Sequence, residues 1–183
     1  MVGACLQSFW SVWQSFGAEP WVLKVLKEGY VVPFVTPPPL SPTPISFPVY
    51  HHHIEKFPVL QEIIQSLLKE VIEPVLDKSL GFYNRLFLVP KASGGWRPVL
   101  DVSSLDEFVR LTPFMMESPN SVVASFQKGD WMMSIDMQDA YFHVPSKFLR
   151  FVFEGRIFQF KALCFGLSTA PQVFTRVLAP LAG

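Results

Sequence analysis

The sequence has no excess of charge of either sign. Its 183 residues include 15 lysines and arginines and 15 aspartates and glutamates, so the formal net charge is zero. A basic excess is the usual electrostatic signature of a nucleic-acid-binding domain. Its absence excludes a uniformly basic surface, so any nucleic-acid contact must depend on a local group of cations.

Cysteine is scarce as well. The two cysteines, Cys5 and Cys164, are far apart in the sequence and fit no metal-ligand spacing. This pattern does not support a disulfide-stabilised scaffold or a cysteine zinc site. Reduced intracellular thiols are the simplest interpretation.

Long hydrophobic runs are missing too. No run reaches the roughly 18 residues that indicate a membrane-spanning helix. The apolar N-terminal stretch has no basic segment before Lys24, so it does not resemble a secretion signal. We therefore expect no membrane partner and an intracellular location, in the cytoplasm or nucleus. The composition predicts no particular oligomeric state.

Apolar and aromatic residues are abundant. Half of the chain is hydrophobic, with 18 phenylalanines and 5 tryptophans. A chain of this length is about one domain and can bury a sizeable core.

Residues 1–57 are predicted to form an N-terminal extension, the lead-in, before the main domain. Apolar residues at positions 6, 9, 10, 13 and 16 predict an amphipathic helix over residues 4–17, whose stripe we expect to pack in the core. A helix that binds a membrane surface or a partner is the alternative. Seven prolines in residues 33–48 predict an extended strap along the domain, with a ligand for a proline-reading module as the alternative.

Residues 58–183 alternate between helical and strand patterns. Apolar periodicity predicts a helix over residues 58–73, and glycine-containing turns predict hairpins over residues 85–102 and 149–160. Ser168 is a candidate cap for a helix that runs to about residue 178. Without a regular βαβ repeat, this order favours an α+β fold.

Two carboxylates follow a strand-like run at residues 131–136. Alternation places Ser134 and Asp136 on the more polar face. A half-buried aspartate needs compensation, and a divalent cation such as Mg²⁺ supplies it. From the spacing alone, a turn-initiating or helix-capping role is the favoured interpretation of Asp136 and Asp139.

Two cations flank the turn of the first predicted hairpin. Lys91 and Arg97 lie on either side of a turn that contains two glycines, where they could together hold a polyphosphate. Solvated surface cations are the simpler alternative.

Together, several blocks resemble the fingers and early palm of retroelement reverse transcriptases. They are residues 72–75, 85–91, 95–101, 134–142 (similar to motif A) and 165–171 (similar to motif B), in matching order and spacing over about residues 58–181. The sequences of the blocks at 97–101 and 165–171 resemble those of the DIRS-like class of retrotransposon. The resemblance implies a partial right-hand polymerase fold, fingers with an incomplete palm, preceded by the helical and proline-rich extension.

The resemblance also implies a role for each matching residue. Asp136 would be the catalytic carboxylate that binds Mg²⁺, with the Met137 carbonyl as a second ligand atom. Six further positions would contact the incoming deoxynucleoside triphosphate: Lys91, Arg97, Asp139, Ala140, Phe165 and Gly166. Tyr141 would act as the sugar gate within the same nucleotide site. The partners would be an RNA or DNA primer-template and the triphosphate.

The chain departs from the family in one decisive respect. It contains no Tyr-x-Asp-Asp sequence, which in the family supplies the other two catalytic aspartates after motif B. We therefore expect a truncated domain that is inactive alone. A non-catalytic remnant that binds nucleic acid, through Lys91, Arg97, Arg150 and Lys161, or binds a protein is the alternative. A smaller departure is Asp106, where family members usually carry asparagine.

Overall fold

The computed structural model describes residues 6–47, 57–69, 71–76, 80–116, 118, 120, 123–124, 126–131, 145–164 and 166–181. The helices are η1 (Leu6–Phe9), α1 (Trp10–Ser15), α2 (Pro20–Glu28), α3 (Phe57–Leu67), α4 (Ser103–Asp106), α6 (Ala170–Leu178) and η4 (Ala179–Leu181). The strands are β1 (Ile72–Pro74), β2 (Arg85–Pro90), β3 (Trp96–Asp101), β4 (Pro145–Phe153) and β5 (Arg156–Ala162). None of the described helices is long and apolar enough to cross a membrane.

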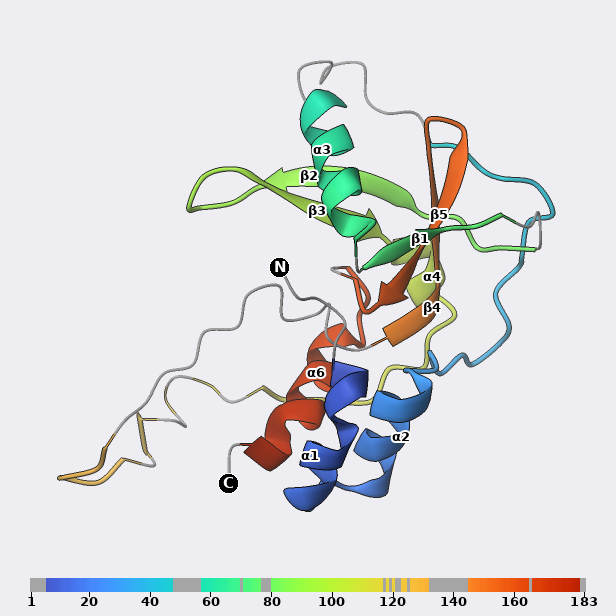
Figure 1. Ribbon diagram of the computed structural model, residues 1–183. Coiled ribbons are helices and arrows are strands. Elements are labelled where there is room, and N and C mark those ends of the chain that lie inside the picture. Colours follow the sequence, from blue (N-terminus) through green and yellow to red (C-terminus); the bar gives the residue numbers. More distant parts are fainter. Residues whose placement is uncertain are drawn as a thin grey trace.

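The strands form two antiparallel sheets, one of three strands in the order β1-β5-β4 and one made of β2 and β3 (Figure 1). Both predicted hairpins are confirmed. The β4–β5 turn is tight because Glu154 and Gly155 both have positive φ, 48° and 70°, as a two-residue hairpin of this twist requires. Among the described residues, helices pack around these antiparallel sheets without βαβ units, so the α+β class is confirmed.

Helix α3 is shorter than its periodicity predicts. Leu60, Ile64 and Leu67 are buried as expected. The predicted continuation to residue 73 is wrong, because the chain turns after Leu67 and Ile72 pairs with Phe160 of β5. The backbone N–H of Lys161 also donates to the Val71 carbonyl at 2.8 Å. Pairing with β5 thus outweighs the local helical preference of residues 68–73.

The N-terminal helix is also shorter and less buried than predicted. Residues 6–15 form η1 and α1, while residues 4 and 5 lie outside the described part. Trp13 is buried, but Phe9 and Phe16 are 50% and 57% exposed, so core packing of the whole stripe is wrong for these two. Only part of the apolar face finds a neighbour, because α1 is six residues long and presents one turn to the core.

Helices α1 and α2 lie beside α6 at the opposite end of the chain (Figure 1). The indole N–H of Trp13 donates to the Val177 carbonyl at 2.7 Å. Val22 and Leu26 of α2 share the same buried cluster as Val173 and Val177 of α6. The lead-in helices are therefore part of one hydrophobic core with the rest of the molecule.

The proline-rich segment follows the outside of the domain, as predicted. Residues 33–47 contain no helix or named strand, and two isolated bridges attach them to the body: Phe34 with Val109, and Ser41 with Gly81. Backbone hydrogen bonds of 2.7 to 3.1 Å accompany these bridges. They fix a strap that makes few bonds of its own.

Candidate functional site

The tip of the β2–β3 hairpin brings two predicted site residues together. Val89 lies opposite Arg97 in the register, and the Lys91 N–H donates to the Gly95 carbonyl at 3.0 Å. Lys91 follows Val89 by two residues on an extended strand, so it lies on the same face as Arg97. Both side chains are exposed. The hairpin thus presents two cations on one face of one turn.

Gly166, a third predicted site residue, lies against the end of β3. Its φ is +116°, and a Cβ placed on it would meet the Leu100 carbonyl oxygen at 2.2 Å. Only glycine allows this conformation and this approach at once. The loop before α6 is therefore in close contact with the strand that carries Arg97.

Ser168 connects this loop to α4 and does not cap α6. The residue at the N-cap is Thr169, without a side-chain cap hydrogen bond. The hydroxyl and backbone N–H of Ser168 both donate to Oδ1 of Asp106, at 2.7 and 3.3 Å. The predicted capping role of Ser168 is wrong, because the Asp106 carboxylate engages it. The predicted helix itself is confirmed, with Pro171 in its first turn.

The remaining predicted site residues lie outside the described part of the chain. These are Asp136, Met137, Asp139, Ala140, Tyr141 and Phe165. Among the residues that the structure does describe, no group of three or more histidine, cysteine, aspartate or glutamate side chains could hold a metal ion. The metal site and the sugar gate therefore stay predictions.

Arg150 has contacts within the fold. It is half-buried, its Nε donates to Oε1 of Gln159 at 3.3 Å, and its Nη1 donates to the Leu80 carbonyl at 3.4 Å. Gln159 in turn donates to Glu73 at 2.6 Å. This row of polar contacts crosses the three-stranded sheet, so Arg150 already has partners within the fold.

Cys164 lies next to the loop that carries Gly166. Its side chain is buried, and burial raises the pKa of its thiol to about 12, with the Asp106 carboxylate acting in the same direction. The thiol is therefore neutral near pH 7 and shielded from reagents. Its burial shows how closely this end of β5 packs in the core.

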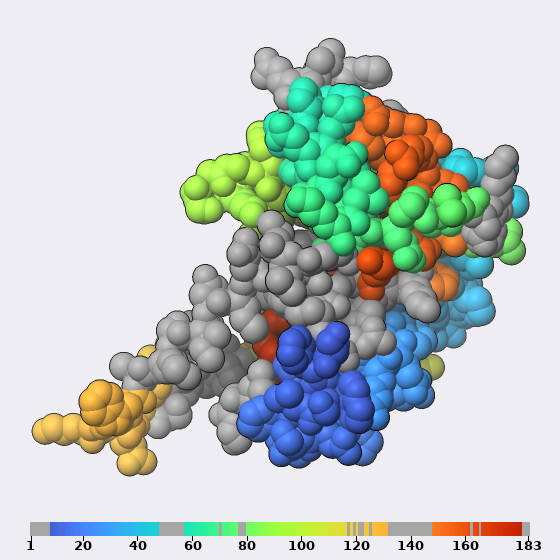
Figure 2. Space-filling view, in the orientation of Figure 1, coloured from blue at the N-terminus to red at the C-terminus, as the bar shows by residue number. Residues whose placement is uncertain are grey.

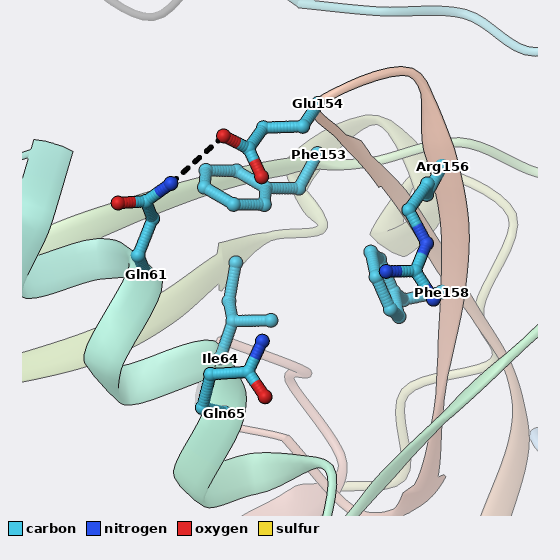
Figure 3. A pocket seen from close by; sticks show the side chains of 7 residues that line it. All are labelled: Gln61, Ile64, Gln65, Phe153, Glu154, Arg156 and Phe158. Carbon is cyan, nitrogen blue, oxygen red and sulfur yellow. Dashed lines mark hydrogen bonds between the residues drawn. The ribbon is translucent and has the colours of Figure 1, made fainter.

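A separate hollow of about 270 Å³ lies between α3 and the β4–β5 turn (Figure 3). Nε2 of Gln61 donates to Oε1 of Glu154 across it at 2.8 Å, and the Arg156 guanidinium lies 5.4 Å from the centre of the Phe158 ring. In the space-filling view, α3 and this turn are neighbours on the visible face (Figure 2). None of the predicted site residues lines the hollow.

Sequence comparison finds distant relatives. No family model matches the chain. It is 26% identical over 141 residues to the Pro-Pol polyprotein of feline foamy virus, and 24% identical over 123 residues to that of simian foamy virus type 1. These matches cover 74% and 64% of this chain, but only 12% and 10% of the relatives' own length.

Structural comparison gives a broader match. A foamy viral protease-reverse transcriptase in complex with dsDNA matches with a TM-score of 0.64 and 20% identity, covering 99% of this chain and 42% of that one. The same type of protein in complex with an RNA/DNA hybrid matches with a TM-score of 0.61, 20% identity and coverage of 99% and 27%. This chain has the fold of part of a foamy viral protease-reverse transcriptase.

Both the sequence matches and the structural matches are to foamy viral proteins. The finer prediction of a DIRS-like class stays open, because the relatives found are foamy viral proteins. At about 20% sequence identity, the likeness to the solved structures shows the fold alone.

Proposed function

We propose that this chain is the fingers and first part of the palm of a retroelement reverse transcriptase, of the DIRS-like class. Its role would be to hold primer-template and deoxynucleoside triphosphate for nucleotidyl transfer. The observation that carries the proposal is the placement of Lys91, Arg97 and Gly166 around β3, in a fold shared with protease-reverse transcriptases that are complexed with nucleic acid.

The hairpin-tip cations have a simple part in this proposal. Two positive side chains on one face of a turn can neutralise phosphate oxygens, and the arginine can grip two of them with its planar fork. Because the chain has no net positive charge, attraction to phosphate has to come from local cations such as this pair. Gly166 would let the loop backbone approach the same nucleotide closely.

The residues of motif A would complete the nucleotide site. Asp136 and the Met137 carbonyl would hold Mg²⁺, which would neutralise charge on the transferred phosphate. Asp139 and Ala140 would donate backbone N–H groups to phosphates, while Tyr141 and Phe165 would shape the sugar and base pocket. The 183-residue chain contains no Tyr-x-Asp-Asp sequence to supply two further carboxylates, so we expect it to bind substrate without extending primers.

The test is binding of a DNA primer-template and an RNA–DNA hybrid, followed by fluorescence anisotropy at several salt concentrations. Arg97→Ala should weaken binding to both duplexes and reduce the slope of log affinity against log salt by about 1, since one phosphate contact is lost. Arg156→Ala is the matched control, because Arg156 also adjoins a hairpin turn but lies beside the separate hollow. We expect it to leave the slope unchanged.

Two results would count against the proposal. A wild-type chain that binds neither duplex would refute the nucleic-acid role, and an Arg97→Ala chain with unchanged affinity and slope would refute the hairpin-tip contact. Primer extension with Mg²⁺ or Mn²⁺ should be absent. Extension that disappears in Asp136→Asn would instead show that the isolated chain is an active polymerase.

A further inference from the structure

We infer that Asp106 is a positioning residue, whose carboxylate holds the loop of Gly166 and Ser168 at a fixed place against β3. Its importance for substrate rests on the proposed function, since Gly166 and Arg97 are then two parts of one nucleotide site. The link itself is a property of the fold and can be tested separately.

Two fastenings hold the loop. At Gly166 the backbone meets the Leu100 carbonyl too closely for any side chain to fit between them. Two residues later, one carboxylate oxygen of Asp106 accepts both the hydroxyl and the backbone N–H of Ser168. Hydrogen bonds to a charged acceptor are stronger than those between neutral groups. This second contact is made by side chains, so a substitution can remove it.

The Asp106 carboxylate is fixed relative to the hairpin. Strand β3 carries Arg97 and ends at Asp101, and α4 begins two residues later. The backbone N–H groups of Leu105 and Asp106 donate to the Val102 carbonyl at 2.9 and 2.8 Å, and Leu105 is fully buried. Arg97 and Asp106 therefore lie on one rigid run of chain, and the loop is positioned relative to that run.

Burial also holds the loop, since Leu167 and Thr169 are only 2% and 3% exposed. The described residues between β5 and α6, 163–164 and 166–169, belong to no named element, and Thr169 at the N-cap of α6 makes no side-chain cap hydrogen bond. Without the Asp106 acceptor, the two donors of Ser168 would have to turn to water. We therefore expect the loop to open locally in Asp106→Ala while the core stays folded.

The buried thiol of Cys164 reports this opening, because it lies two residues before Gly166 and is only 1% exposed. Alkylation of Cys164 by iodoacetamide, followed by peptide mass spectrometry on the full chain, measures how often the loop opens. Asp106→Asn is the decisive comparison. It removes the charge that influences the thiol, as Asp106→Ala does, but keeps an oxygen that can accept from Ser168.

We expect Cys164 in Asp106→Ala to react about two- to tenfold faster than in Asp106→Asn, the size expected for a lost hydrogen bond to a neutral acceptor. Ser168→Ala, which keeps the backbone donor, should give a smaller increase over the wild type. Asp101→Ala is the matched control, because Asp101 accepts the same pair of donors from Ser103, at 2.6 and 3.3 Å, but does not touch the loop. Cys164 there should react as in the wild-type chain.

Equal rates in Asp106→Ala and Asp106→Asn would overturn the inference, as would an equal acceleration in Asp101→Ala. Duplex affinity supplies the functional readout, and it should fall in Asp106→Ala and recover in Asp106→Asn. Faster alkylation with unchanged affinity would show that the link does not position the nucleic-acid site. If the wild-type chain binds no duplex, the proposed function fails, and the alkylation rates alone decide whether Asp106 holds the loop.

Discussion

Gly166 is the residue whose replacement the structure tolerates least. A Cβ at this position faces both an unfavourable φ of +116° and the Leu100 carbonyl oxygen at 2.2 Å. We expect Gly166→Ala to lower the free energy of unfolding by about 2–6 kcal/mol, since backbone strain and steric overlap each cost about 1–3 kcal/mol. Urea denaturation measures the change.

Gly94→Ala separates the two costs. Gly94 also has a positive φ, of +87°, but a Cβ there would have no atom within 4 Å. We expect a loss of about 1–2 kcal/mol, from the left-handed conformation alone. If both variants lose the same amount, the close approach to Leu100 is not what makes Gly166 necessary.

At the residue scale, the sequence predicts contacts between residues that are close in the chain. The glycines after Lys91 predicted a turn that would bring it near Arg97, and the register confirms this arrangement. The link between Asp106 and Ser168 was missed because the two lie 62 residues apart. The only sequence signal at Asp106 is that family members usually carry asparagine at this position. An asparagine would also offer an acceptor oxygen to Ser168.

At the scale of elements, hairpins were easier to predict than helix ends. Their turns carry their own signal in Glu154-Gly155 and Gly94-Gly95. The end of α3 is set by pairing between β1 and β5, which no local pattern announces. Helix α2 was missed although its sequence contains a signal: Pro20 opens it, Val22, Val25 and Leu26 form its buried face, and Gly29 ends it.

A charged pair joins α2 to α6. The guanidinium of Arg176 binds the carboxylate of Glu19, with a second contact of 3.0 Å from Nη2 to Oε2, and lies 4.1 Å from the centre of the Trp21 ring. The hydrogen bond from Arg176 lowers the pKa of Glu19 below its ordinary value of 4.5. The pair therefore stabilises the fold above pH 4.5, and this contribution is lost as the pH falls through the lowered pKa.

Glu19→Gln should consequently reduce the free energy of unfolding at neutral pH and not in acid. The reduction should stay below about 1 kcal/mol, because both side chains are partly exposed to solvent. Urea unfolding of the variant and the wild type from pH 7 to pH 2 gives the difference at each pH, including the range below the lowered pKa. Glu28→Gln is the control, since its carboxylate lies 4.0 Å from Lys24 on an exposed face. A Glu19→Gln difference that persists in acid would rule out this origin.

At the scale of the whole molecule, one core joins the two ends of the described chain. Trp13 and Val177 are 164 residues apart and yet share a buried hydrogen bond. Such contacts depend on the complete path of the chain, so periodicity predicted α1 and α3 but not their neighbours. The residues of motif A, which carry most of the proposed chemistry, lie outside the described part, and their assignment rests on the sequence resemblance.

Part of the exposed apolar surface lies after this core, on the described residues of the segment between Leu111 and Trp131. Figure 1 shows its final described residues, 126–131, projecting away from the body. Leu111, Met115 and Met116 are 63%, 93% and 62% exposed. Exposed apolar patches promote association between molecules, so we expect the isolated chain to self-associate through this segment.

The combined variant Leu111→Gln, Met115→Gln and Met116→Gln should remove much of this association without weakening the fold. Exposed side chains away from special features change the free energy of unfolding by no more than about 0.5 kcal/mol each. Sedimentation velocity over a range of concentrations measures the association, and urea denaturation measures the stability.

Leu105→Gln is the contrasting variant, because Leu105 is fully buried and a buried amide without partners costs several kcal/mol. Unchanged sedimentation of the triple variant would place the self-associating surface elsewhere. A loss of stability comparable to that of Leu105→Gln would instead show that these three side chains belong to the core.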